Sequence, residues 1–429
     1  MDWLNQDGMT FDEGALWIDQ FINDLKSNKI GTDPYPIALR GINWIKFISK
    51  HHADIDPSHL KRWNDALYSQ YHYLSDHLEF HLLGNHLLED VFSLFVASLY
   101  FNNIRFYRKS TKILRRQLKE QILEDGAHYE QSPMYHCILL DRLLDCYNFS
   151  LSNPIFKGQS EFTDTLKEKA IRMLGHLEGI MYKDGSIPLF NDAAFKIAPT
   201  PTEIFEYAKR LRLDWTSLPL SDSGYRRFEA GRVEGIIDIG NIMASYQPGH
   251  THADTFNYEL RIDGKPFIID TGISTYEKNR RRQYERSTSA HNTVSIDNKD
   301  SSEVWGGFRV GKRASVTILE DSNLIIKASL KGFDRNLKHT REFNLYEGLN
   351  VIDEISKGHH GISYIHFAPD IKAEVQDKRI ITDKAVIIID GADEIKLTED
   401  TASTEYNDLH TISKVEIHFT DRMEYNILI

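Results

Sequence analysis

The first half of the chain places apolar residues at the spacing of amphipathic helices. Within residues 12–27, Ile18, Ile22 and Leu25 fall on one helical face. Residues 33–50 open with Asp33 and prolines, which is a signal for the start of a helix. The same period predicts helices over 57–80, 85–105, 107–124, 134–150, 161–182 and 202–212. So many helices with short connections favour an array of α-hairpins or a toroid over a small bundle.

After about residue 220 the apolar pattern changes to alternation. Residues 256–270 form two strand-like runs joined by Asp263-Gly264, a strong signal for a hairpin. Residues 314–332 alternate around a turn at 321–323. Many short strands separated by turns predict an antiparallel β-sandwich. We therefore expect an α+β multidomain chain, with a helical domain at 1–218 and a sandwich domain at 219–429.

Charge and composition narrow the classes of partner. The formal net charge is −12, which makes non-specific binding to nucleic acid unfavourable and requires a local cationic cleft for any acidic substrate. No apolar run reaches the length of a membrane span, and the acidic N-terminus carries no signal-peptide pattern. The expected location is cytoplasmic for the chain as written, or periplasmic for a mature or truncated form. With two cysteines, a zinc site would depend on histidine and carboxylate.

The segment HLLGNHLLED, residues 81–90, is a first candidate for chemistry. If a helix starts near Asn85, then Asn85, His86 and Glu89 share one face. The alternative is an asparagine N-cap followed by ordinary polar helix positions.

A second candidate is EDGAHYEQSPMYH, residues 124–136. Asp125-Gly126 predicts a turn, and Ser132-Pro133 predicts the start of a helix. The segment presents Tyr135 among further polar side chains, and the alternative is a polar loop around a buried tyrosine. Those further side chains are His128, Tyr129, Glu130 and His136.

The third candidate is PGHTHAD, residues 248–254. If the segment is a strand, its two histidines and Asp254 point to the same side, because side chains alternate. Asp270 closes the next predicted strand and His291 opens another. A histidine, an aspartate and a second histidine from neighbouring segments are a reasonable set of zinc ligands.

The fourth candidate is the basic run YEKNRRRQYERST, residues 276–288. It carries Arg280, Arg281, Arg282 and Arg286 in a chain that is otherwise acidic. This run is either a solvated loop or the cationic surface that an anionic polymer needs.

Taken in order, these motifs resemble those of the heparinase II/III-like polysaccharide lyases. The segments that carry the resemblance are DPYPIALRGINW, NHLLE, DGAHYEQSPMYH, GHTHAD, IIDTG and RSTSAHNTV. The first of them resembles a branch associated with bacterial exopolysaccharide and capsule clusters. The resemblance implies an incomplete (α/α) toroid followed by an antiparallel β-sandwich. It also implies β-elimination at a uronic acid of an acidic polysaccharide.

The resemblance also implies roles for single residues. Asn85 and His86 would neutralise the uronate carboxylate, and His86 could instead act as a base for substrates of the other C5 configuration. Tyr135 would give or take the proton, His250 would be the catalytic or carboxylate-side histidine, and Tyr276 would be a second active-site tyrosine. Substrate contacts would come from Glu89, Arg40, Arg280, Arg282 and Arg286, although Arg40 also fits an ordinary surface helix position. Zinc would be bound by His252, Asp270 and His291, and it would mainly hold and position the site. Asp254 would support these ligands.

Two other functions fit the same sequence. One is a hydrolase, or another enzyme that processes exopolysaccharide on the same scaffold, in which a metal-bound water could act. The other is a glycan-binding protein without catalysis. The polymer, its uronate configuration and the oligomeric state are not specified by these motifs.

Overall fold

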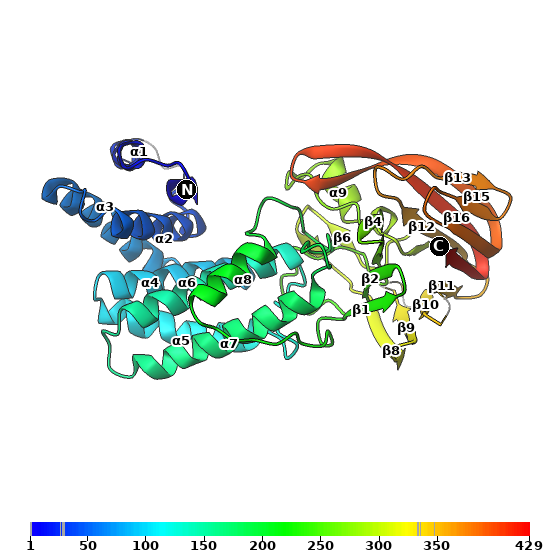
Figure 1. Cartoon of the computed structure of the whole chain (residues 1–429), viewed down its shortest axis with the longest axis horizontal. Coiled ribbons are helices and arrows are strands. Elements are labelled where there is room, and N and C mark those ends of the chain that lie inside the picture. The colour runs from blue at the N-terminus through cyan, green and yellow to red at the C-terminus, as the bar shows by residue number, and fades with distance from the viewer. Residues whose placement is uncertain (1, 26, 28–30, 333, 335, 347) are drawn as a thin grey trace. The chain divides into compact units, whose positions relative to one another are not determined.

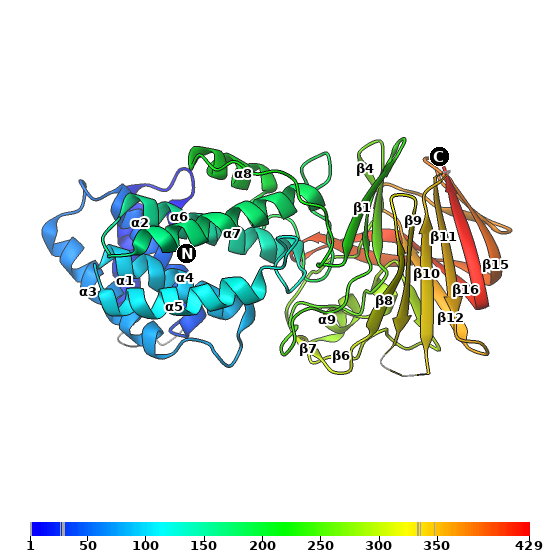
Figure 2. The same ribbon diagram turned by 90° about the horizontal axis from the view of Figure 1, so that it is seen from below.

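The computed structural model describes residues 2–25, 27, 31–332, 334, 336–346 and 348–429. Contacts divide the chain into two compact units. The helical unit comprises Met1–Gln121, Leu139–Ile171 and Leu211–Leu213, and the sheet unit comprises Ile122–Ile138, Arg172–Arg210 and Asp214–Ile429. Figures 1 and 2 follow the chain from blue helices to yellow and red strands. No helix of the described residues is long and apolar enough to cross a membrane.

The predicted helices are all present, with ends that differ by a few residues. A short 3-10 helix, η1 (Asp2–Asn5), precedes them. The helices are α1 (Phe11–Asp24), α2 (Pro34–Lys50), α3 (Pro57–Asp76), α4 (Gly84–Tyr100), α5 (Ile104–Gln121), α6 (Pro133–Ser152), α7 (Gln159–Ile180) and α8 (Pro201–Arg210). Side chains that accept backbone N–H bonds fix two of the starts, Thr10 before α1 and Asp56 before α3.

Helix α4 is the most deeply buried helix of the helical unit that we describe. It packs against α2, α3 and α5, and nearly all of its side chains are buried. The Ser93 hydroxyl donates to the Ala38 carbonyl at 2.7 Å and lies 3.0 Å from the Tyr71 hydroxyl. Gly41 of α2 leaves the space that Tyr71 fills, since a Cβ there would lie 2.3 Å from the phenol oxygen.

The first sheet is a four-stranded antiparallel meander in the order β1-β2-β3-β4. Its strands are β1 (Tyr225–Ala230), β2 (Val233–Asp238), β3 (Tyr258–Ile262) and β4 (Lys265–Ile268). Ile262 pairs with Lys265, so Asp263 and Gly264 form the predicted two-residue turn, with φ of 52° and 74°. The hairpin prediction is confirmed.

The second sheet has ten strands and follows the order β13-β14-β15-β16-β11-β10-β9-β8, with β12 pairing β16 and β5 (Figure 2). Its strands are β5 (Val294–Ile296), β8 (Ser315–Asp321), β9 (Ile325–Lys331), β10 (Lys338–Asn344), β11 (Leu349–Ile355), β12 (His360–His366), β13 (Glu374–Gln376), β14 (Arg379–Ile381), β15 (Val386–Glu405) and β16 (Asp408–Leu428). Apolar residues of both sheets form one buried cluster, which confirms the predicted antiparallel sandwich.

An ion pair inside this sandwich holds loops as well as strands. Arg341 of β10 donates to Asp353 of β11 at 2.7 and 2.8 Å, and both side chains are fully buried. The same guanidinium donates to the backbone carbonyls of Phe256 and Asn292 at 2.9 and 2.6 Å. Burial opposes the charged form, but Arg341 holds the pKa of Asp353 below its usual value.

We predict that Asp353→Asn lowers the free energy of unfolding by about 3–5 kcal/mol, because Arg341 is left charged and buried. Urea denaturation measures this change. The matched control is Asp263→Asn, whose exposed partner Arg232 should make the cost less than about 1 kcal/mol.

The pH dependence gives a second readout of the same substitution. The folded pKa of Asp353 is depressed, so its stabilising contribution is present above the unfolded pKa of about 3.9 and is lost as the pH falls through the lower folded value. The difference in free energy of unfolding between wild type and Asp353→Asn should therefore become smaller below about pH 4. A difference that does not change with pH would contradict the assignment of a stabilising, ionised Asp353.

Candidate active site

A buried carboxylate fixes the segment that precedes α6. Asp125 accepts hydrogen bonds from the backbone N–H groups of Ser221 and Ser223 at 3.0 and 2.9 Å, and from the Ser223 hydroxyl at 2.6 Å. Burial would raise the pKa of Asp125, but His176 and these bonds hold it below its usual value. Gly126 has φ of 82°, and a Cβ there would lie 2.1 Å from the Arg172 carbonyl. The predicted Asp-Gly turn thus anchors this segment.

Helix α6 begins as predicted at Ser132-Pro133 and places Tyr135 in its first turn. The Ser132 hydroxyl donates to the Asp192 carbonyl at 2.6 Å and accepts from the Tyr135 N–H at 3.2 Å. The Tyr135 ring stacks on the His250 ring with centroids 3.8 Å apart. Its phenol oxygen lies 3.3 Å from that of Tyr276. The structure therefore brings together three of the predicted catalytic residues, Tyr135, His250 and Tyr276.

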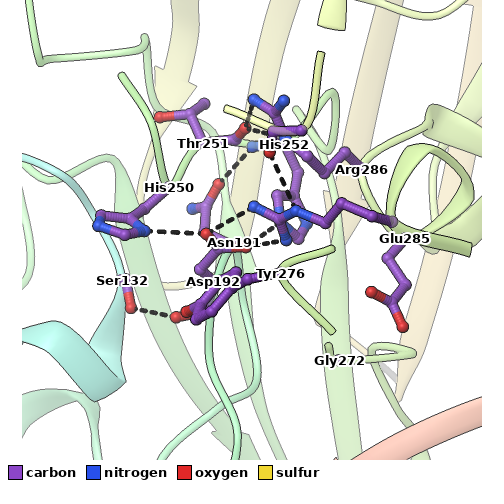
Figure 3. Close-up of polar contacts among 12 residues, drawn as sticks. Ser132, Asn191, Asp192, His250, Thr251, His252, Gly272, Tyr276, Glu285 and Arg286 are labelled. Atoms are coloured by element: carbon purple, nitrogen blue, oxygen red, sulfur yellow. Dashed lines mark hydrogen bonds and ion pairs between the residues drawn. The ribbon is translucent and has the colours of Figure 1, made fainter. Parts of the chain in front are cut away.

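Asp192 is the centre of the polar network (Figure 3). His250 Nδ1 donates to one carboxylate oxygen at 2.9 Å, and His252 Nε2 donates to the other at 2.8 Å. The Arg282 guanidinium donates to both oxygens, at 2.8 Å to Oδ2. Although Asp192 is fully buried, Arg282 and the two histidines keep its pKa well below the usual value.

The sequence analysis did not select Asp192 or its neighbour Asn191. Asn191 adopts φ of 57°, accepts from the His252 N–H at 2.9 Å and donates to the Gln131 carbonyl at 3.1 Å. No spacing rule marks Asn-Asp in this loop. The available signal was indirect, because two histidines and an arginine run that share a site require a counter-charge.

The backbone of PGHTHAD differs from the predicted strand. Residues 248–254 lie in an irregular segment between β2 and β3. His291 follows the 3-10 helix η2 (Thr288–Ala290), while Asp270 lies beyond the end of β4. Side chains here bond to backbone groups that a neighbouring strand would otherwise bond. Arg286, for example, donates to the Thr251 carbonyl at 2.8 Å. The prediction that residues 250–254 form a strand with one common face is wrong, although both histidines reach Asp192.

The predicted metal ligands form a buried cluster. His291 Nδ1 donates to Asp270 Oδ2 at 2.8 Å, and the His252 and His291 rings are 5.3 Å apart. His252 Nδ1 and His291 Nε2 are buried without hydrogen-bond partners. Burial lowers the pKa of His252 to about 3, which keeps it in the neutral form that binds metals.

Two features of this cluster fit a zinc ion. Histidine and aspartate are common zinc ligands, and two imidazole nitrogens lack a hydrogen-bond partner. Asp270 also accepts from Asn257 and from the Gly272 N–H at 2.8 Å. As placed in the described parts of the chain, no three His, Cys, Asp or Glu side chains converge on a metal position. The zinc set therefore stays a prediction.

The basic run forms helix α9 (Arg280–Glu285). Arg282 and Arg286 are fully buried and bonded to protein, and Arg280 is exposed. Arg281 donates to Glu285 at 2.8 Å. The expectation of a solvated or substrate-facing surface is wrong for Arg282 and Arg286, because the protein uses their charges internally.

Four further predicted residues belong to the helical unit. Asn85 lies inside the first turn of α4, after Leu83 with φ of 59°, so the alternative of an asparagine N-cap is wrong. His86 Nδ1 donates to Glu79 at 2.8 Å. Glu89 is fully buried, with Arg142 at 3.5 Å. The roles of Asn85, His86 and Glu89 in catalysis or substrate binding stay predictions.

Arg40 is buried, not on the surface of α2. Its guanidinium donates to Gln70 at 2.8 and 2.6 Å and lies 4.2 Å from the centroid of the Phe21 ring. Desolvation lowers its pKa to about 10. The interpretation of Arg40 as a surface arginine is wrong.

The pKa values of the two tyrosines of the site are raised in this environment. Burial raises the pKa of Tyr135 despite the hydrogen bond with Tyr276 and the nearby Arg282. Burial and the charge of Asp192 raise the pKa of Tyr276 as well. His250 is the remaining group of this cluster, and its Nδ1 is occupied by Asp192. The arrangement pairs protonated phenols with an imidazole oriented by a carboxylate, which suits acid–base chemistry.

Comparison with known families identifies the family of this chain. Residues 40–209 match the model described as Heparinase II/III N-terminus, and residues 213–428 match Heparinase II/III-like, C-terminal. This chain belongs to the heparinase II/III-like family. The heparin-sulfate lyase of Pedobacter heparinus is 24% identical over 262 residues, covering 54% of this chain and 39% of that protein. The enzyme of Bacteroides stercoris is 23% identical over 339 residues, covering 69% and 47%. The aligned regions span less than half of these relatives.

Solved structures of a heparinase and of a chondroitin lyase share the fold. A heparinase III crystal structure has a TM-score of 0.76 at 18% identity and covers 98% of this chain and 74% of its own. The chondroitin AC lyase of Streptomyces coelicolor A3 has a TM-score of 0.57 at 8% identity, covering 99% and 71%. The predicted fold class, an (α/α) toroid followed by a β-sandwich, is confirmed.

We predict that Asp192 and Arg282 are strongly coupled in their contributions to the free energy of unfolding. Asp192→Asn and Arg282→Met should each destabilise the protein by about 3–5 kcal/mol, because each leaves a buried partner unsatisfied. The double variant should cost clearly less than the two single changes together, with a coupling of about 2–3 kcal/mol in urea denaturation. Additive costs would contradict a direct ion pair. The exposed pair Arg232–Asp263 provides the control cycle, with an expected coupling below about 1 kcal/mol.

Proposed function

We propose that this protein is a polysaccharide lyase that cleaves a uronate-containing, acidic polysaccharide by β-elimination. The observation that carries the proposal is the contact of Tyr135 with both His250 and Tyr276, in a site where Asp192 orients the imidazole. Support also comes from relatives named heparin-sulfate lyase. Heparan sulfate is therefore the first polymer to test.

The chemistry requires three events at the sugar. The uronate carboxylate must be neutralised, the proton at C5 must be removed, and the leaving O4 must be protonated. The C4–O4 bond breaks as the C4–C5 double bond forms, and the polymer is cleaved without water. A pair of carboxylates of the kind that hydrolases use is therefore not needed.

We assign these events to residues by their protonation. His250, with Nδ1 held by Asp192, accepts the C5 proton at its other nitrogen, since a fixed tautomer and a carboxylate partner strengthen an imidazole base. Tyr135 retains its phenol proton and donates it to O4. Tyr276 stabilises Tyr135 through the contact between the phenol oxygens. The role of Asn85 and His86 in neutralising the carboxylate stays a prediction from the family resemblance.

We predict that Tyr135→Phe reduces the rate of double-bond formation by at least about 100-fold, because it removes the acid while leaving the ring. The ultraviolet absorbance of the new C4–C5 double bond reports the rate on heparan sulfate and on a panel of other uronate polymers. The free energy of unfolding should change little. Tyr346→Phe, at an exposed position, is the control and should retain full activity. Activity of Tyr135→Phe equal to wild type would exclude Tyr135 as the acid.

We further propose one zinc ion bound by His252, Asp270 and His291. In such a site zinc supplies a structural cross-link, and elimination needs no metal-bound hydroxide. His252 would then contact the metal. His250, two residues away, would act on the sugar with its other nitrogen while Asp192 holds Nδ1.

The zinc proposal predicts about one metal ion per chain, consistent with a single three-ligand site. His291→Ala should lose the metal and lower the melting temperature, whereas His360→Ala at an exposed position should keep both. Elemental analysis and thermal unfolding measure these outcomes without reference to activity. A wild-type protein that binds no zinc after dialysis against it would exclude the site. A folded, metal-free protein should keep its lyase activity.

A further inference from the structure

A small hairpin beside the candidate active site presents an unusual pair of side chains. Strands β6 (Val304–Trp305) and β7 (Arg309–Val310) pair so that Trp305 lies directly opposite Arg309. Opposite residues of a strand pair project from the same face. Val304 is buried on the other face, whereas Trp305 is 55% exposed and Arg309 is exposed. The hairpin thus displays an indole and a guanidinium to solvent together.

Side chains of helix α9 and of Arg286, the residue that follows it, bond to backbone carbonyls of this hairpin. Gln283 donates to the Val304 carbonyl at 2.9 Å, Arg282 Nε donates to the Gly307 carbonyl at 3.0 Å, and Arg286 lies 3.4 Å from the Trp305 carbonyl. Arg282 is the same residue that pairs with Asp192. The hairpin is therefore fixed to the network that orients His250.

The hairpin also touches Tyr276, one of the predicted active-site residues. Phe308, at its turn, packs against Tyr276 with ring centroids 5.6 Å apart. Gly306 and Gly307 form the turn with φ of 61° and 79°, a conformation that disfavours other residues. The turn that carries Phe308 therefore fixes the hairpin next to Tyr276.

The charges around the hairpin favour an anionic ligand. Within the described residues, Arg309 has no acidic side chain at ion-pair distance. Lys278 adds a second exposed cation beside the turn, because a Cβ on Gly307 would lie 3.1 Å from its Cγ. The carboxylate of the nearby Glu303 accepts from the Lys312 N–H at 3.1 Å and does not pair with Arg309. Positive charge is therefore available here in a chain with a net charge of −12.

We propose that Trp305 and Arg309 form a sugar-binding subsite for an acidic polysaccharide. The apolar face of a sugar ring stacks on the indole, and the guanidinium pairs with a carboxylate or sulfate group of the same chain. The identity of the ligand class rests on the proposed lyase function. The subsite extends substrate contact beyond the residues that transfer protons and makes binding depend on chain length.

Binding and turnover together test the subsite. In the full-length chain carrying Tyr135→Phe, adding Trp305→Ala should weaken binding of a heparan sulfate decasaccharide about tenfold, and of a tetrasaccharide much less. Arg309→Gln should act in the same direction, and Arg309→Lys should act less. With the active tyrosine present, Trp305→Ala should raise KM for the polymer about tenfold and leave kcat within about twofold.

Matched controls are Tyr346→Ala for loss of an exposed aromatic ring and Arg379→Gln for loss of an exposed charge; both should bind as the parent does. Trp305→Phe keeps a stacking surface and should retain most of the affinity. Equal binding by the parent and Trp305→Ala, or no binding by the parent to any uronate polymer, overturns the subsite. Binding that depends on Trp305 without double-bond formation keeps the subsite and overturns the lyase reaction. If elimination occurs and neither binding nor KM changes in Trp305→Ala, the lyase reaction stands and the subsite is overturned.

Discussion

The site depends on a single buried negative charge. The Asp192 carboxylate is fully buried, and the protein surrounds it with the Arg282 guanidinium and the imidazoles of His250 and His252. Without Arg282 the carboxylate would be too costly to keep ionised, and without Asp192 the arginine would be equally unfavourable. This mutual requirement fixes both histidines, α9 and the β6–β7 hairpin in relation to one another.

The same burial sets the protonation of the tyrosines. Tyr135 and Tyr276 lie close to Asp192, and desolvation together with that negative charge keeps both phenols protonated. In the proposed reaction, the His250 imidazole held by Asp192 is the base. Elimination at a uronate needs one group to take a proton and another to give one, and the proposal assigns these tasks to His250 and Tyr135. His252, one of the proposed zinc ligands, also donates to Asp192. It therefore connects the proposed metal position to the same network.

Much of the architecture followed from periodicity, because amphipathic helices and alternating strands leave their period in the sequence. The Asp263-Gly264 turn and the Ser132-Pro133 helix start were likewise local signals. Asp192 was not predictable in this way, since its partners come from segments as distant as Arg282 and its role exists only after folding. The irregular path of residues 250–254 was missed for the same reason: Asn191 and Arg286 bond its backbone groups, so no strand partner is needed. Charged residues in the sequence also suggested a surface at Arg282 and Arg286, where the folded protein uses them as buried counter-charges.

We propose that this site transfers protons and adds no water. Mass spectrometry of products formed from a uronate polymer in water enriched in heavy oxygen tests this directly. β-Elimination predicts oligosaccharides that end in an unsaturated uronate and take up no heavy oxygen in the cleavage step. Saturated products that gain one solvent oxygen for each bond cleaved would show hydrolysis and exclude elimination.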